Sequence, residues 1–212
     1  MKSNKEFFNL IKKNDREKAV LFVLDLLNKN KLSIIEFFEN LIIPTMKEIQ
    51  IGCEHKNENF CVSKKQIMLN ILRTTIECSY PYIITKKEKL NGRKVIVISP
   101  EGEISEIGAL IATYFFEMAG FETQYLGANT KTDNLLKALK WFKPNYIAIG
   151  ISNFYNAIQT REIIDESKKM LPRLKIVAGG PAFSIEDVEK ILPHDFFIRK
   201  YSDILKLEKE DK

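Results

Sequence analysis

The sequence predicts an α/β protein, in which a bundle of four helices precedes a doubly wound, parallel, five-stranded sheet. Two observations support this fold class. Residues 1–85 carry apolar side chains at helical spacing, whereas short apolar runs alternate with helical segments in residues 94–212. Residues 86–93 are charged and contain a turn-forming Asn91-Gly92 pair. They predict a linker between a helical domain, 1–85, and an α/β domain, 94–212.

Cap and turn residues divide the helical half. Asn14-Asp15 should end the first helix and cap the second, which residues 28–30 end. Ser33 predicts the N-cap of a third helix. Pro44 falls inside that helix and should kink it or reset it.

A polar loop is expected at residues 52–60, and a fourth helix from Ser63. Phe37 and Phe38 of the third helix are expected in the core, whereas Phe60 has a loop position that can face a ligand. Four helices joined by short loops indicate an antiparallel bundle.

The second half has the alternation of a flavodoxin-like or Rossmann-like domain. Its apolar runs are short, as expected for strands covered by helices on both faces. The predicted strands are 94–99, 123–126, 146–150, 175–178 and 196–198. The predicted helices between them are 105–118, 132–141, 157–170 and 185–191.

Parallel strands of this kind bind ligands at their carboxyl ends. Neither a dinucleotide-binding glycine motif nor a P-loop follows the first strand. Ser152 ends the third strand, where its hydroxyl group can hydrogen-bond a nitrogen heterocycle held between sheet and loop. Gly179-Gly180, followed by Pro181, ends the fourth strand, and glycines there let a flat ligand lie against the backbone. The double glycine is also compatible with an ordinary strand-to-helix turn.

Composition excludes several function classes. The net charge of +5 comes from scattered lysines, so no nucleic-acid groove is expected. Neither a secretory signal nor an apolar run of membrane-spanning length is present, and the chain is expected in the cytoplasm with reduced cysteines. Cys53, Cys61 and Cys78 lack zinc-site spacing, and His55 and His194 are the only histidines. The oligomeric state stays open.

Residues 94–184 resemble the cobalamin-binding domain of methionine synthase and of the corrinoid proteins of methyltransferase systems. That family carries Asp-x-His-x-x-Gly after the first strand, and here Glu103 and Gly108 keep the frame while Ser105 replaces the histidine. Ser152 and Phe154 stand at the first and third positions of the family's Ser-x-Leu motif. The remaining matches are the Leu-Gly turn and the double glycine, at Leu126, Gly127, Gly179, Gly180 and Pro181.

The helical half is similar to the cap bundle that precedes this domain in the same proteins. Residues 41–46 resemble its Leu-Ile-x-Pro-x-Met run, and Phe60 and Val62 resemble the segment before its last helix. Related light-sensing regulators carry a Trp and a Glu-His pair there. With Val62 held in register, the Trp position becomes His55, and Lys65-Gln66 replace the pair.

In that family the loop histidine binds cobalt from below and displaces the cofactor's own dimethylbenzimidazole. The resemblance implies that the displaced nucleotide tail enters the sheet core beside the serine and the double glycine. Ser105 is a poor neutral ligand, and Glu103 has no imidazole to orient. On its own, Ser105 is more simply an N-cap. Three outcomes stay open: a corrinoid bound with its tail still inserted and its lower face empty or bound to water, a cobalt or haem iron held by His55, or no cofactor at all.

These observations predict a cobalamin-binding protein that lacks the usual lower histidine. It would carry a corrinoid for methyl transfer or respond to cobalamin as a sensor, with the chemistry supplied by the cobalt and by a partner methyltransferase or regulator. The alternative is a regulatory interaction module of the same fold that binds haem through His55 or binds no cofactor. Neither a nucleophile–base pair nor paired carboxylates indicate a stand-alone catalyst.

Overall fold

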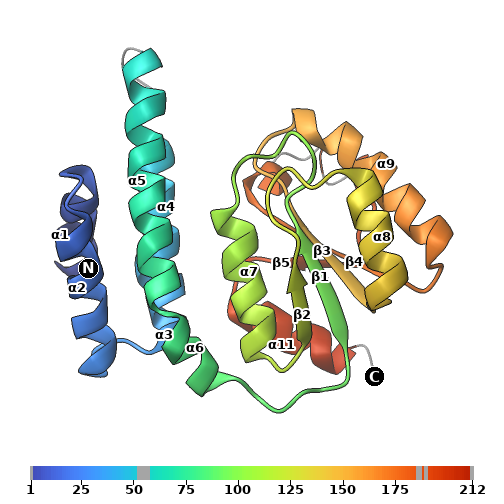
Figure 1. The fold of residues 1–212 in the computed structure, drawn as a ribbon, viewed down its shortest axis with the longest axis horizontal. Coiled ribbons are helices and arrows are strands. Elements are labelled where there is room, and N and C mark those ends of the chain that lie inside the picture. Colours follow the sequence, from blue (N-terminus) through green and yellow to red (C-terminus); the bar gives the residue numbers. More distant parts are fainter. Residues whose placement is uncertain (1, 52–57, 185–187, 189–190, 211–212) are drawn as a thin grey trace. The chain divides into compact units, whose positions relative to one another are not determined.

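The computed structural model describes residues 2–51, 58–184, 188 and 191–210. Its contacts divide the chain into two compact units, Met1–Lys86 and Lys87–Lys212. The first unit is helical, and the second is an α/β sheet (Figure 1). The predicted fold class is confirmed.

The helices of the first unit follow the predicted order, with one addition. They are α1 (Lys2–Lys12), α2 (Arg16–Asn28), α3 (Ile34–Glu36), the π-helical η1 (Phe37–Ile42), α4 (Ile43–Ile51), α5 (Glu58–Cys78) and α6 (Tyr80–Lys86). The short helix α6 was not predicted, because the sequence from Tyr80 begins with Tyr-Pro-Tyr and resembles a helix end.

Side-chain caps set two of these helix boundaries. The Asp15 carboxylate accepts a hydrogen bond from Lys18 N and caps α2. Ser33 and Glu36 form a reciprocal capping box: Glu36 N donates to Ser33 Oγ at 3.2 Å, and Ser33 N donates to Glu36 Oε2 at 2.8 Å. Both predicted caps are therefore confirmed, and each satisfies backbone donors that a helix start leaves free.

Pro44 resets the third helix without ending it. The π-helical segment η1 lies just before it, and there Ile43 N donates to Phe38 O, five residues back. Proline has no N–H and its ring clashes with the preceding turn of an α-helix, whereas the wider π turn removes that conflict. Phe37 and Phe38 lie on η1 and are fully buried, as predicted.

The second unit is built on a five-stranded sheet in the order β2-β1-β3-β4-β5. Each neighbouring pair of strands is parallel. The strands are β1 (Lys94–Ile98), β2 (Glu122–Tyr125), β3 (Tyr146–Gly150), β4 (Lys175–Gly179) and β5 (Phe196–Ile198). The predicted strands agree with these within one residue.

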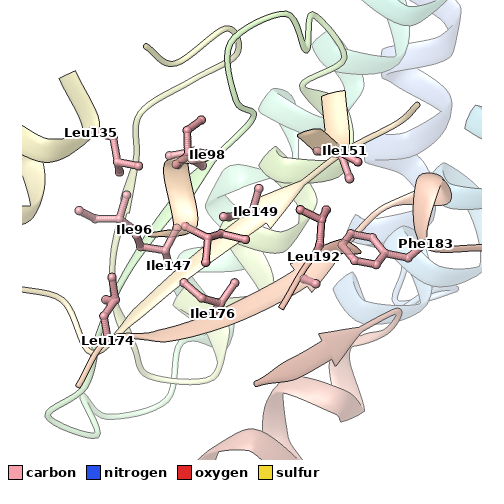
Figure 2. Packing of buried hydrophobic residues seen from close by; sticks show 14 of the residues in the cluster. Ile96, Ile98, Leu135, Ile147, Ile149, Ile151, Leu174, Ile176, Phe183 and Leu192 are labelled. Atoms are coloured by element: carbon pink, nitrogen blue, oxygen red, sulfur yellow. The ribbon is translucent and has the colours of Figure 1, made fainter. Parts of the chain in front are cut away.

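Helices cover both faces of this sheet (Figure 1). One face carries α7 (Ile107–Met118) and α11 (Tyr201–Glu210), which contact each other, and the opposite face carries α8 (Thr132–Phe142) and α9 (Tyr155–Met170). Alternate strand residues point to opposite faces. Ile96, Ile98, Ile147, Ile149 and Ile176 therefore pack together under α8 and α9 (Figure 2).

Two segments differ from the predictions. The segment predicted as a linker is hydrogen-bonded to the second unit, since Glu88 N donates to Met118 O and Asn91 N to Gly120 O. Helix α11 was not predicted, because its sequence is mostly charged and polar. The predicted helix 185–191 lies largely outside the described residues.

None of the helices in the described part of the chain combines the length and apolar character needed to cross a bilayer.

Candidate functional site

The carboxyl ends of the strands bring three loops of the second unit together. In the order β2-β1-β3, the strand that follows β1 in the chain lies on one side of it, and β3 lies on the other side. The strand order therefore reverses at β1. Parallel α/β sheets hold their ligands at such a reversal. Of the residues that the sequence singled out, the loops that follow β1, β2 and β3 contain Glu103, Ser105, Leu126, Gly127, Ser152 and Phe154.

Glu103 is the central residue of this edge. Its side chain is 2% exposed. Ser152 donates to its carboxylate twice, from the backbone N at 2.7 Å and from Oγ at 2.8 and 2.9 Å. Asn156 Nδ2 donates at 3.1 Å, and Ser105 N donates at 3.1 Å. The buried carboxylate is thus stabilised by uncharged donors, as burial of a charge requires.

The β2–α8 loop is attached to the same segment. Gly102 N donates to Asn129 Oδ1 at 2.9 Å, and Asn129 N donates to Glu103 O at 3.0 Å. Asn129 adopts a positive φ of 53°, which asparagine tolerates better than most residues. The loops after β1, β2 and β3 therefore form one connected structure with Glu103 at its centre.

Ser105 does not cap a helix, contrary to the simplest interpretation of its position. Helix α7 begins at Ile107, and its N-cap residue is Glu106, without a capping bond from that side chain. The backbone of Ser105 is held instead, because Ser99 Oγ donates to Ser105 O at 3.2 Å and Ser105 N bonds Glu103. The carboxylate of Glu103 and the hydroxyl group of Ser99 thus hold the backbone of the loop at Ser105.

The glycines of this edge divide into two kinds. A Cβ at Gly180 would lie 2.2 Å from Ile151 O, and a Cβ at Gly179 would lie 3.5 Å from the side chain of Ile198. In contrast, a Cβ at Gly108 or at Gly127 would meet nothing within 4 Å. The double glycine is therefore packed against the protein itself, whereas Gly108 and Gly127 adjoin open space.

Exposed apolar side chains follow three of the strands at this edge. Ile104 follows β1 and is 77% exposed, Leu126 follows β2 and is 37% exposed, and Tyr155 follows β3 and is 87% exposed. Phe154 is half-buried and packs against the core cluster of Figure 2 instead. Pro181, after β4, is exposed. Exposed apolar residues that gather at one edge are typical of a binding surface.

The predicted residues of the first unit are placed differently from expectation. Phe60 and Val62 both lie on α5, which begins at Glu58 and not at Ser63, so Phe60 is not a loop residue. Val62 is 67% exposed. Cys53 and His55, the candidate ligand of a metal, lie outside the described residues.

Sequence reasoning missed Asn156, and it did not single out Asn129 or Ile104 within the loops that it placed at this edge. Asn156 is 8% exposed, and its amide completes the set of donors to Glu103. Its position four residues after Ser152, on the first turn of a helix, was the available signal. Within residues 2–51, 58–184, 188 and 191–210, no three His, Cys, Asp or Glu side chains are grouped as a metal site.

Known proteins share the family of the second unit and the fold of the chain. The model of the B12 binding domain matches residues 93–205. The monomethylamine corrinoid protein of Methanosarcina barkeri has a similar structure, with a TM-score of 0.81 at 16% identity, over 100% of this chain and 99% of that chain. A comparison with curated proteins finds no match.

Two further structures have a related fold. One is a cobalamin-binding protein of Desulfitobacterium hafniense DCB-2, with a TM-score of 0.50 at 19% identity, over 97% of this chain and 96% of that chain. The other is the methanol:cobalamin methyltransferase complex of Methanosarcina barkeri, with a TM-score of 0.51 at 14% identity, over 97% of this chain and 77% of that chain.

The second unit has the α/β fold, and the first unit the preceding helical segment, of the corrinoid protein to which this chain is similar. Since the family model covers more than half of the 212 residues, the chain belongs to the B12 binding domain family.

Proposed function

We propose that the second unit binds a corrinoid and that the chain carries it for methyl transfer by a partner protein. Membership of the B12 binding domain family is the observation that supports this function most strongly. The similarity in fold to corrinoid proteins over the whole chain supports it further.

The residues at the carboxyl edge fit a corrin ring. A corrin is a flat, bulky macrocycle with apolar faces and amide groups around its rim. No atom lies within 4 Å of a Cβ built at Gly108 or at Gly127, so a ligand can approach the backbone there, and the exposed side chains of Ile104, Leu126 and Tyr155 offer apolar contact. These five residues are the proposed contacts of the macrocycle.

The same loop offers no nitrogen ligand for cobalt. Ser105 stands at the histidine position, and the carboxylate of Glu103 is already engaged by Ser152 and Asn156. When bound, a corrinoid supplies a cobalt centre that accepts and releases a methyl group. The role that we assign to this chain is to hold and orient the ring, and Gly108, Gly127 and the apolar side chains of the edge would contact it, whereas Ser105 would offer the cobalt no imidazole.

The partner is proposed to be a methyltransferase. The similarity to a methanol:cobalamin methyltransferase complex favours this class of partner over a regulator. The alternative is a cobalamin-responsive sensor, or a haem-binding module that uses His55. The B12 binding domain match supports the corrinoid and lends no support to haem.

Retention of the cofactor tests this function. The purified full chain is mixed with hydroxocobalamin, methylcobalamin or haem, desalted, and examined by visible spectroscopy. We expect each cobalamin to be retained at about one molecule per protein chain, and haem to be removed by desalting. Retention of haem alone, with a spectrum that changes in His55→Ala, would support the haem-binding alternative, and retention of nothing would remove the carrier proposal.

A further inference from the structure

The hydroxyl group of Ser152 is already used within the protein. A serine hydroxyl has one hydrogen to donate. In this chain Ser152 Oγ lies 2.8 Å from Glu103 Oε1 and 2.9 Å from Glu103 Oε2, and its backbone N lies 2.7 Å from Oε2. A nitrogen heterocycle whose free nitrogen accepts a hydrogen bond would need this same hydrogen. Serving it would require Ser152 to turn away from a buried carboxylate.

That rotation would cost Glu103 one of its short hydrogen bonds and leave it the bonds from Ser152 N, Asn156 Nδ2 and Ser105 N. The side chain is 2% exposed, so water cannot replace a lost donor. Asn156 Nδ2 and Ser105 N, each at 3.1 Å, are the longer of the bonds that it accepts. Loss of a hydrogen bond to a buried charged group is among the larger single penalties in proteins.

The double glycine is likewise in contact with the protein itself and leaves no space beside Gly180. Gly180 has a φ of 105°, and a Cβ there would lie 2.2 Å from Ile151 O and 3.0 Å from Ile151 N. Ala182 N donates to Ile151 O at 3.3 Å and fixes this approach. The small size of Gly180 therefore allows the β4 turn to rest on the β3–α9 loop. Ile151 and Phe183, which Figure 2 shows beside this turn, are 1% and 7% exposed.

We propose that Glu103 takes the hydrogen bond a nucleotide base would use, so that the chain binds a corrinoid by its macrocycle and leaves the nucleotide tail outside the sheet core. This inference rests on the proposed function and specifies its ligand class: corrinoids are accepted irrespective of the lower base, including those that lack one. A bound cobalamin keeps its own base on the cobalt.

The test compares cobalamin with cobinamide, which has the macrocycle but lacks the nucleotide. Dissociation constants of the full chain for hydroxocobalamin and aquacobinamide are measured by equilibrium titration. We expect them to agree within about tenfold, a difference of less than about 1.4 kcal/mol. We also expect the visible spectrum of bound cobalamin to be that of cobalt with its nitrogen base attached.

Each contrary outcome has a distinct meaning. Cobinamide binding more than about tenfold weaker than cobalamin, or a spectrum of cobalt without its base, would overturn the inference and leave the carrier function intact. Failure of both corrinoids to bind would remove the proposed function and this inference with it.

Ser152→Ala tests the serine directly, with Ser105→Ala as the matched control. The alanine variant keeps the backbone N–H that bonds Glu103. We expect the ratio of cobalamin to cobinamide affinity to stay within about threefold of that of the unaltered chain in both variants. A selective loss of cobalamin affinity in Ser152→Ala would show that the serine holds the base.

Discussion

Replacing Glu103 with alanine is expected to destabilise the second unit by about 3 kcal/mol. The change removes an acceptor that serves Ser152, Asn156 and Ser105. Ser152 N and Asn156 Nδ2 would then lie in a protein interior without a partner, and an unsatisfied buried donor costs about 1–3 kcal/mol. The loss of a buried charge offsets part of this penalty.

Glu103→Gln separates the charge from the shape. A glutamine amide has one accepting oxygen and a donating NH₂ group. When its oxygen takes the place of Oε2, which accepts from Ser152 N and Asn156 Nδ2, its NH₂ group faces the Ser105 N–H that Oε1 accepts in the unaltered chain. We expect it to lose most of the stability that Glu103→Ala loses. Urea unfolding followed by the fluorescence of Trp141, the single tryptophan and a residue of the second unit, measures the effect.

The matched control is Glu101→Gln. Glu101 is a glutamate of the same loop and is not among the partners of the Glu103 carboxylate. Its replacement should change the free energy of unfolding by less than about 0.5 kcal/mol. Equal effects at the two positions, or a Glu103→Gln protein as stable as the unaltered chain, would contradict the role assigned to Glu103.

Gly180→Ala is expected to cost about 3 kcal/mol or to prevent the second unit from folding. Gly180 has a φ of 105°, a region that residues with a Cβ rarely adopt, and its Cβ would lie 2.2 Å from a backbone oxygen of Ile151. Backbone cannot move aside as a flexible side chain can. Thermal unfolding by circular dichroism, with the yield of folded protein, measures the effect.

Gly108→Ala serves as the comparison. Its Cβ would meet nothing within 4 Å, and the residue lies in the first turn of α7, where alanine is a better helix former. We expect a stability equal to that of the unaltered chain or up to about 1 kcal/mol higher. A Gly180→Ala protein as stable as Gly108→Ala would mean that the β4 turn does not rest on Ile151.

Much of the fold could be predicted because its signals are local. The apolar run before Ser99 and the similar run of β3 are typical of strands buried on both faces, and Asp15 and Ser33 are ordinary helix caps. The response to Pro44 was harder to foresee, because a proline predicts that a helix changes there and does not predict a π turn.

The candidate site could be located from the sequence, but its hydrogen bonds could not. The carboxyl ends of parallel strands identify the loops, so Glu103, Ser152 and Gly180 were all found. Their partners depend on how the loops fold back over one another. Asn156 reaches Glu103 across 53 residues of sequence, and no local pattern records such a contact.

The most direct test of the central claim is a titration of the full chain with hydroxocobalamin, compared with Gly108→Phe and with Gly108→Ala as its control. The account predicts that the unaltered chain and Gly108→Ala bind within about threefold of each other, and that Gly108→Phe binds at least about tenfold more weakly because its ring occupies the open space beside α7. Binding by Gly108→Phe equal to that of the unaltered chain, or no binding by any of the three, would contradict a corrinoid site at this edge of the sheet.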